Sequence, residues 1–515
     1  MVEEKTETSV STSLTGVFEL VTIIEQRFPV DSIKLADRTK LWNLLRVLLC
    51  FYPWKQDTKT KKSSLKTLAY MIKDGLSPLN LSPKKIDICG FSDTESRKWR
   101  NGKFYNVYID PFYDVLGDKF WVFEWPTAKG KRRHPKKQIY SKNYVPMRIP
   151  VFSKTLFDLG LSQVSKKKKV SIESEDVLKE VISFFCIHTD INEDELSKYI
   201  YDAVNIFFYM KRFFVKFLRK ISPKAVLIRC GYGRFHMALS QACKELGIPS
   251  IELQHGNITR YHVGYVRCNH SDNTDCVPEY LLTYGDIYTD IVRKGYLFQP
   301  EKVVSIGFPY LEEVKEMPPR VNEEVKKFVS KFSRVILVTS QWTFREEIKN
   351  FIVDVSKTLV NTRKTYGIIF KPHPRDERDY SDMQKYENIF LADKYGDIYE
   401  FFQVADIHST VYSTSAIESL AFGKPNLFLN IGISIQDMFD IIDDESSFLL
   451  KSPNQFIETL DHVVSQYKSV SKAANITSEK IYKPQAKKNF EKFLRSINIK
   501  TEDTIKGYTE KGEAL

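Results

Sequence analysis

The feature that most constrains the fold is a regular alternation of short apolar runs with amphipathic stretches between residues 225 and 429. Runs such as Ala225–Cys230 and Tyr366–Lys371 have the length of strands, whereas Arg234–Leu246 has the length and spacing of a helix. Strands that alternate with helices favour parallel sheets covered by helices on both faces. Because a Pro318-Pro319 break interrupts the alternation, we predict an α/β protein with two doubly wound, Rossmann-like domains.

The sequence around these two series predicts further strands and helical additions. Three short runs bounded by Gly, Pro, Asp or Asn, as strands are, lie at Ile86–Phe91, Phe104–Ile109 and Phe120–Trp125. Val17–Phe28 and Leu41–Phe51 carry apolar residues at helical spacing. We expect a helical N-terminal extension at 1–84, a first Rossmann-like domain at 85–315, a second at 325–470, and a helical tail at 471–515 that packs back over the N-terminal half.

No segment predicts a helix that crosses a membrane. The most apolar stretch, Leu41–Trp54, is shorter than the ~20 residues a span needs and contains Arg46. The polar opening Met1–Gly16 is unlike a secretory signal, so we expect a cytoplasmic protein, soluble or peripheral at the inner membrane face. The basic aromatic stretch Ile206–Lys220 would suit a membrane surface, but Pro223 and a strand follow at once, which favours packing against the sheet.

The net charge of +12, from 77 Lys+Arg against 65 Asp+Glu, favours polyanionic neighbours. These are phosphorylated substrates, an anionic membrane face or nucleic acid. The basic runs Lys129–Lys137 and Lys166–Lys169 indicate solvated loops or a basic rim near an anionic lipid or polymer acceptor. A basic nucleic-acid-binding protein is an alternative of another class. The sequence carries no RRM, KH or zinc signature, so we expect no nucleic-acid partner.

The seven cysteines show no paired CxxC spacing, which is typical of reduced thiols. Cys268, His270 and Cys276 have no fourth ligand at zinc-finger spacing. We therefore predict no metal site.

Ligands of a doubly wound sheet bind beyond the carboxyl ends of its strands, and Gln254-His255-Gly256 directly follows the strand predicted at Ser250–Leu253. Gly256 allows a sharp turn and a close ligand. A neutral imidazole is suited to removing a hydroxyl proton. His255 is thus a candidate general base, the alternative being a histidine satisfied by loop carbonyls.

Two arginines flank the Gly231-Tyr232-Gly233 turn after the preceding strand. Arg229 and Arg234 would reach an anion bound at the strand ends, or form surface ion pairs.

A second strand-end motif is Lys371-Pro372-His373-Pro374-Arg375. The prolines stiffen the backbone around His373, and Lys371 and Arg375 add positive charge on either side. A stiff, cationic loop suits a phosphate group that must be held while charge builds on it. The alternative is a rigid basic turn.

A third motif is the hydroxyl cluster Ser409–Ser415, which precedes a predicted helix. Ser413, Thr414 and Ser415 at a helix N-terminus would offer donors to an anion. Ser415 and Glu418 also fit the capping box S-x-x-E. Glu418 is therefore a candidate either for helix capping or for a ribose hydroxyl.

Together the motifs QHG (254–256), KPHP (371–374) and STVYSTSAIESLAFGKP (409–425) resemble those of GT-B enzymes of surface polysaccharide synthesis. That group includes bacterial polysialyltransferases, lipooligosaccharide sialyltransferases and the glycerophosphotransferases that build teichoic acids. The resemblance covers about residues 85–470. The chain departs from the sialyltransferase pattern by having Ser-Thr-Ser where a Ser-Ser pair is expected.

The resemblance implies two Rossmann-like domains facing a cleft and an inverting glycosyltransferase that moves a sugar from a nucleotide-sugar donor to a surface glycan or lipid-linked acceptor. It implies that His373 contacts the donor phosphate, that the 413–415 cluster binds the same anion, and that His255 is the general base. No DxD-type pair is evident, so we expect no metal and no cofactor beyond the substrate.

Two other enzyme activities fit the same motifs. One is transfer of glycerol or ribitol phosphate. The other is non-hydrolysing epimerisation of a UDP-sugar at C2.

Overall fold

The computed structural model describes residues 14–53, 86–125, 136–147, 170–318, 320–341, 344–362, 365–374, 376–394, 396–431, 445–450 and 452–499. They form two compact units. Unit 1 takes its residues from Met1–Thr283, Tyr288–Ile306 and Lys487–Leu515, and unit 2 from Tyr284–Ile287 and Gly307–Ala486.

The sheet of unit 1 has seven parallel strands in the order β11-β10-β9-β8-β2-β5-β6. The chain runs from β2 to one edge and from β8 to the other, so its direction reverses between these two neighbours. In doubly wound sheets this reversal marks the ligand site. The strands are β2 (Ile88–Asp93), β5 (Phe120–Trp125), β6 (Tyr144–Pro146), β8 (Ala225–Ile228), β9 (Ser250–Leu253), β10 (Tyr280–Thr283) and β11 (Val303–Ser305).

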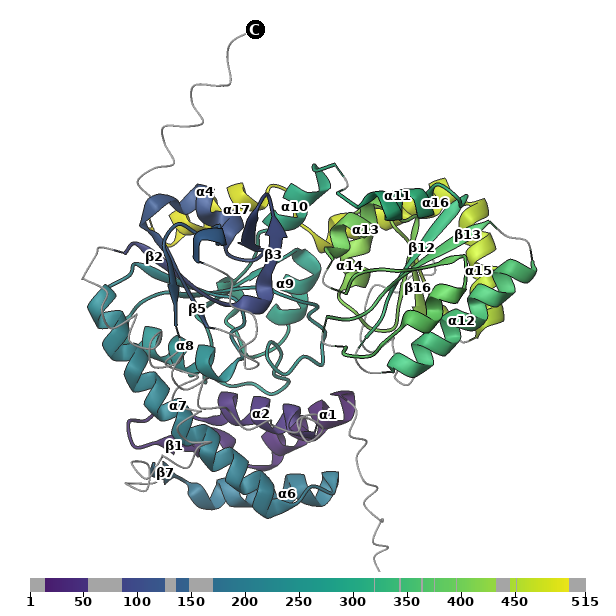
Figure 1. The fold of residues 1–515 in the computed structure, drawn as a ribbon. Helices are drawn as coiled ribbons and strands as arrows, with labels where there is room; N and C mark the ends of the chain where they lie inside the picture. The colour runs from purple at the N-terminus through teal and green to yellow at the C-terminus, as the bar shows by residue number, and fades with distance from the viewer. Residues whose placement is uncertain are drawn as a thin grey trace, which may run out of the picture. The chain divides into compact units, whose positions relative to one another are not determined.

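The long helix α7 (Glu193–Ile221) packs on this sheet and beside α8 (Arg234–Leu246) (Figure 1). Its N-cap, Asn192, accepts a hydrogen bond from the Glu195 N–H group. The rings of Phe214 and Phe217 lie 6.0 and 6.5 Å from Phe91 on β2. The prediction that Ile206–Lys220 packs against the sheet is confirmed.

The N-terminal helices α1 (Leu14–Arg27) and α2 (Trp42–Phe51) belong to unit 1. They lie together with α6 (Glu175–Thr189), and the short pair β1 (Lys34–Leu35) and β7 (Ile172–Glu173) is antiparallel. Both helices were expected from their spacing. Among its described residues, unit 1 also contains the short helix α4 (Tyr113–Leu116) and, from residue 288 on, α9 (Asp286–Arg293).

The strand predicted at Phe104–Ile109 is present but ends at Asn106. Residues 97–106 form an antiparallel hairpin of β3 (Arg97–Arg100) and β4 (Lys103–Asn106), apart from the main sheet. Its turn residues, Asn101 and Gly102, have φ values of 50° and 73°. Two successive positive φ values suit the tight turn that joins adjacent antiparallel strands.

Helix α17 (Ala486–Ser496) joins the core of unit 1. The rings of Phe490 and Phe112 lie 4.1 Å apart, and the Asn489 amide donates to the Ile306 carbonyl. By contrast α16 (Tyr467–Ile481) belongs to unit 2. The segment expected to be one tail from residue 471 is therefore divided between the two units.

Unit 2 has six parallel strands in the order β14-β13-β12-β15-β16-β17. The chain direction reverses between β12 and β15, which are neighbours. Right-handed crossovers in opposite directions place helices on opposite faces, and Figure 1 shows helices on both sides of this sheet. The strands are β12 (Arg334–Thr339), β13 (Tyr366–Lys371), β14 (Ile389–Leu391), β15 (Ile407–Thr410), β16 (Asn426–Leu429) and β17 (Ser447–Leu450).

Among the described residues, the helices of unit 2 besides α16 are α10 (Pro309–Lys315), α11 (Glu323–Val329), α12 (Arg345–Asn361), α13 (Ile398–Val404), α14 (Ser415–Leu420) and α15 (Pro453–Ser465). Helix α12 packs with α15, and α14 packs with α16.

Among the described residues, every helix is too short or too polar to span a bilayer. Of the basic run Lys129–Lys137, residues 129–135 lie outside the described residues, and so does all of the run Lys166–Lys169.

Candidate active site

The point where the strand order of unit 1 reverses carries a partly buried ion pair. Asp93 ends β2, Arg229 follows β8, and their side chains pair across the two strands. The guanidinium of Arg229 also lies over the ring of Tyr108, 5.2 Å from its centroid. Arg229 therefore provides a fixed positive charge at the carboxyl edge of the sheet.

His255 lies next to this pair, after β9, and three tyrosines hold it. The Tyr108 hydroxyl donates to the His255 carbonyl at 2.9 Å. On the imidazole, Nε2 is 3.1 Å from the Tyr232 hydroxyl and Nδ1 is 3.3 Å from the Tyr265 hydroxyl. Hydroxyl groups thus contact both ring nitrogens, and the backbone of Arg229 also hydrogen-bonds to the ring, so the alternative of a histidine satisfied by loop carbonyls is met in part.

Glu252 in β9 completes this cluster from beneath. Its Oε1 accepts hydrogen bonds from the Gly231 N–H group at 2.7 Å and from the Tyr265 hydroxyl at 2.8 Å. If the single proton of Tyr265 is shared with Glu252, its oxygen accepts from His255 Nδ1–H. A chain from Glu252 through Tyr265 then fixes the tautomer that leaves Nε2 as the basic nitrogen.

Burial dominates the electrostatics of the cluster. It lowers the pKa of His255 well below the ordinary value, and the positive charge of Arg229 lowers that pKa further. Burial also lowers the pKa of His262 to about 4 and raises the pKa of Glu252 to about 8. At neutral pH the imidazole of His255 is therefore uncharged, as a proton acceptor must be.

The other site residues predicted in unit 1 are Gln254 and Gly256, which adjoin His255 in the sequence, and Arg234, which lies on α8. Gln254 is buried, and its amide donates to the Gly256 carbonyl at 2.8 Å, which fixes the turn. Arg234 begins α8 and lies 5.8 Å over the ring of Tyr199 on α7. Gln254 and Gly256 thus adjoin His255, whereas the described contact of Arg234 is structural.

In unit 2, the loop after β13 presents His373. Lys371 is buried, and its ammonium donates to the Asp393 and Lys394 carbonyls at 3.4 and 3.1 Å. The His373 carbonyl accepts from the Asp376 N–H group at 2.9 Å, and its ring is partly exposed. Arg375 lies outside the described residues.

The hydroxyl cluster follows β15 on the same edge of unit 2. Ser413 Oγ accepts from the Ser415 N–H group at 3.2 Å, and Thr414 is exposed. The Ser415 hydroxyl points inward, where it lies 3.0 Å from Thr339 Oγ1 and 3.2 Å from His408 Nε2. Thr414 is therefore exposed and Ser413 partly exposed, while the Ser415 hydroxyl is engaged in a buried polar network.

The capping box predicted for Ser415 and Glu418 is not formed. Ser415 is the first residue of α14 and not its cap, and the cap Thr414 makes no side-chain bond to the helix. The Glu418 carboxylate instead accepts from the Tyr399 hydroxyl at 2.9 Å. The buried partners of Ser415 draw its side chain away from the backbone N–H groups.

Gln341 was missed in the sequence. It follows β12, and its amide oxygen, when turned toward the 412–413 loop, accepts from the N–H groups of Tyr412 and Ser413 at 3.2 and 3.0 Å. The Ser340 N–H group donates to the Lys371 carbonyl at 3.0 Å. The loops that follow β12, β13 and β15 thus share one edge, and a polar residue just after a buried strand was the signal that could have identified Gln341.

The described residues hold no cluster of three His, Cys, Asp or Glu side chains able to bind a metal ion. Cys268 and His270 are exposed, whereas Cys276 is buried and free.

Solved structures resemble this fold at low sequence identity. A putative UDP-N-acetylglucosamine 2-epimerase from Listeria monocytogenes has 12% identity and a TM-score of 0.51, over 81% of this chain and 96% of that one. The wall teichoic acid polymerase TagF has 13% identity and a TM-score of 0.47, over 88% of this chain and 97% of that one. A search of curated proteins finds no significant match. The epimerase likeness places the two units in the GT-B class, as the motifs predicted.

One family model matches residues 238–498, about half of the chain, and this stretch contains the His255, His373 and Ser413 loops. The family is described as CDP-glycerol:poly(glycerophosphate) glycerophosphotransferase. The chain therefore belongs to this family of transferases.

Proposed function

We propose that the protein transfers glycerol phosphate from CDP-glycerol to a hydroxyl group of a surface polymer or lipid-linked acceptor, at the cytoplasmic face of the membrane. The observation that carries this proposal is the family match, because it spans all three strand-end motifs. Two features of the structure support it: the imidazole of His255 is uncharged, and the unit 2 loops carry accessible side chains that can donate hydrogen bonds to a phosphate group.

In the proposed reaction, the acceptor oxygen attacks the phosphorus that bears glycerol. The new P–O bond forms as the bond from that phosphorus to the bridging oxygen of CMP breaks, and CMP leaves with the electron pair. The acceptor proton passes to His255 Nε2. The Tyr232 hydroxyl, 3.1 Å from Nε2, relays that proton, because it gives its own proton to Nε2 as it takes the one from the acceptor oxygen. A general base of this kind contributes on the order of 10²–10⁴ in rate.

In unit 2 we assign the donor phosphates to the loops that follow β13 and β15. His373 is partly exposed, Ser413 is partly exposed and Thr414 is exposed, so their side chains are accessible to a ligand. Donors aimed at a leaving group that gains negative charge stabilise the transition state more than the ground state. We expect no metal requirement, so that EDTA leaves the rate unchanged.

The test combines ligand-induced thermal shifts with CMP release in the presence of acceptor. CDP-glycerol should raise the melting temperature more than UDP, GDP or their sugars, since a ligand of the native state stabilises it by mass action. His373→Ala should lose this shift. His255→Gln should retain the shift and lose about 10²-fold or more in kcat. His270→Gln, at an exposed histidine on the same long loop, is the matched control and should behave as wild type.

Glycosyl transfer from a nucleotide-sugar, the activity first expected from the motifs, is distinguished by the same screen. Selective stabilisation by one nucleotide-sugar, with its nucleotide released only when acceptor is present, would replace glycerol phosphate by a sugar. Interconversion of two free UDP-sugars without acceptor would indicate an epimerase. Either result would overturn the proposed donor.

A further inference from the structure

The long loop after His255 lacks a helix or strand among residues 254–279 and is held largely by the N-terminal helices. Within this loop His262 accepts from the Tyr265 and Val266 N–H groups through its carbonyl, at 2.9 Å each. The loop also carries Tyr265, whose hydroxyl contacts both Glu252 and His255. The position of His255 therefore depends on what fixes this loop.

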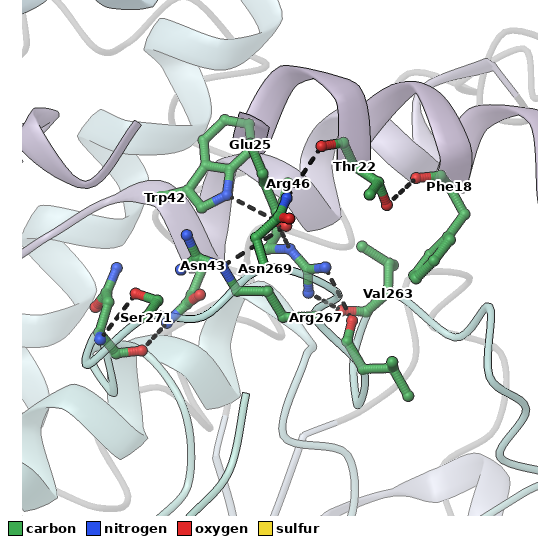
Figure 2. Close-up of polar contacts among 12 residues, drawn as sticks. Phe18, Thr22, Glu25, Trp42, Asn43, Arg46, Val263, Arg267, Asn269 and Ser271 are labelled. Atoms are coloured by element: carbon green, nitrogen blue, oxygen red, sulfur yellow. Dashed lines mark hydrogen bonds and ion pairs between the residues drawn. The ribbon is translucent and has the colours of Figure 1, made fainter. Parts of the chain in front are cut away.

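Arg46 on α2 is the main anchor of the loop. Its two terminal nitrogens donate to the carbonyls of Val263 and Val266, at 2.5 and 2.9 Å. These carbonyls flank Tyr265 on both sides in the sequence. Figure 2 shows the guanidinium reaching from the helix to the loop. An arginine that donates to two backbone carbonyls fixes both the position and the orientation of the segment between them, because its donors form a rigid fork.

Arg46 is itself held by a buried acidic group. Glu25 on α1 accepts from Arg46 Nε at 2.8 Å and from the Trp42 indole at 2.9 Å, and its second oxygen is 3.6 Å from Arg267. Arg267 lies in the same loop and pairs with Asp31 at 3.0 Å. The side chains of Glu25 and Arg46 are 0% and 1% exposed. Two elements that precede the sheet in sequence thus enclose both ends of the 263–267 segment.

Helix α2 also contacts Tyr232, the residue that meets the other ring nitrogen of His255. The ring of Phe51, at the end of α2, stacks on Tyr232 at 6.0 Å with an interplanar angle of 16°. Tyr232 is the residue whose hydroxyl contacts His255 Nε2. Gly264 of the loop packs on the same ring so closely that a Cβ there would lie 2.5 Å from Tyr232. Tyr232 is therefore enclosed between α2 and the loop.

We propose that α1 and α2 are a positioning device for His255, with Arg46 and Phe51 as its positioning residues. Arg46 sets the segment that carries Tyr265, and Phe51 sets Tyr232, so the two hydroxyls meet opposite nitrogens of one imidazole. A buried ion pair adds little net stability compared with an apolar pair of the same size. The network is thus better explained by geometry than by stability. The kinetic consequence rests on the proposed function, whereas the structural consequence does not.

The test uses Phe51→Leu, since Phe51 is only partly buried and the change leaves the Arg46 network intact. The matched control is Phe28→Leu, because Phe28 is also partly buried and its ring contacts Phe184 on α6, at 5.5 Å, away from Tyr232. The first readout is the rate at which diethyl pyrocarbonate modifies His255, followed by mass spectrometry of the peptide. It needs no substrate.

We expect faster modification of His255 in Phe51→Leu and no change in Phe28→Leu. With CDP-glycerol, we expect kcat to fall about tenfold with KM nearly unchanged, as for a misplaced catalytic group. The acid limb of the pH–rate profile should move toward higher pH, because a less enclosed imidazole titrates closer to its ordinary pKa. Arg46→Lys, which retains the charge but loses the fork, should act in the same direction.

The inference is overturned if Phe51→Leu and Arg46→Lys both fold and diethyl pyrocarbonate modifies their His255 at the wild-type rate. It is also overturned if Phe28→Leu matches Phe51→Leu in every readout. Changed His255 reactivity without any CDP-glycerol turnover in wild type would instead refute the proposed function and leave the positioning device standing.

Discussion

Replacing Glu252 by Gln removes the titrating carboxyl group beneath His255 while keeping its shape. Glu252 is 1% exposed, and burial raises its pKa from 4.5 to about 8 despite hydrogen bonds from Gly231 and Tyr265. Between these two pH values the folded protein holds a proton that the unfolded chain has released. The free energy of unfolding must therefore fall as pH rises through this window.

The size of the effect follows from the two pKa values. Their difference is about 8 minus 4.5, or about 3.5 pH units. At about 1.4 kcal/mol per unit, the carboxyl group costs the wild type on the order of 5 kcal/mol between these limits. That is a large part of the ~5–15 kcal/mol that holds a domain folded. Glu252→Gln has no such proton to lose.

The assay is guanidinium unfolding of wild type and Glu252→Gln at several pH values from about 5 to about 8. The denaturation midpoint of the variant should rise relative to wild type as pH increases. Burial lowers the pKa values of His236 and His262 to about 3 and about 4 in the folded state, so over this range they titrate only in the unfolded chain, and they do so in both proteins. The comparison therefore isolates the carboxyl group. Glu301→Gln, at an exposed glutamate, controls for the lost negative charge. A midpoint difference that is constant with pH, or that moves the other way, would refute the burial argument.

Further substitutions test unit 2 and the N-terminal region. Ser415→Ala should lower the free energy of unfolding by about 1–3 kcal/mol in denaturant melts, because it leaves partners in a buried polar network without their bond. Ser413→Ala should instead weaken CDP-glycerol binding, seen by calorimetry, with stability nearly unchanged. Lys211→Met should cost about 1–3 kcal/mol, since the buried ammonium pairs with Asp37 and with Glu245 at 2.6 Å; unchanged stability would mean that the two partly exposed carboxylates need no partner.

The alternating elements were predictable because their burial is repeated along the chain. The helix Arg234–Leu246 and the strand Ser250–Leu253 were expected with the bounds that the structure has. Strands covered on both faces must be apolar throughout, and that requirement is visible in any window of sequence. The three strand-end motifs were found for the same reason, since each directly follows such a run.

The contacts that make the site were not predictable, because they join residues far apart in sequence. Tyr232 and Tyr265 meet His255 only because β8, β9 and the following loop come together in the fold. Likewise, the inward turn of Ser415 depends on Thr339 at the end of β12. A local pattern such as S-x-x-E describes what a segment can do alone, and the tertiary partners decided otherwise.

One local signal did point to these contacts, namely a charged residue inside an apolar segment. Glu252 interrupts the buried strand β9, and Arg46 interrupts the most apolar helix. Burying an ionised side chain without partners costs several kcal/mol, so such a residue persists only where the fold supplies partners or shifts its pKa. Glu252 is met by Tyr265, and Arg46 by the carbonyls on either side of Tyr265. Because both exceptions converge on one loop, the residues that the apolar pattern cannot explain are the ones that hold His255 in place.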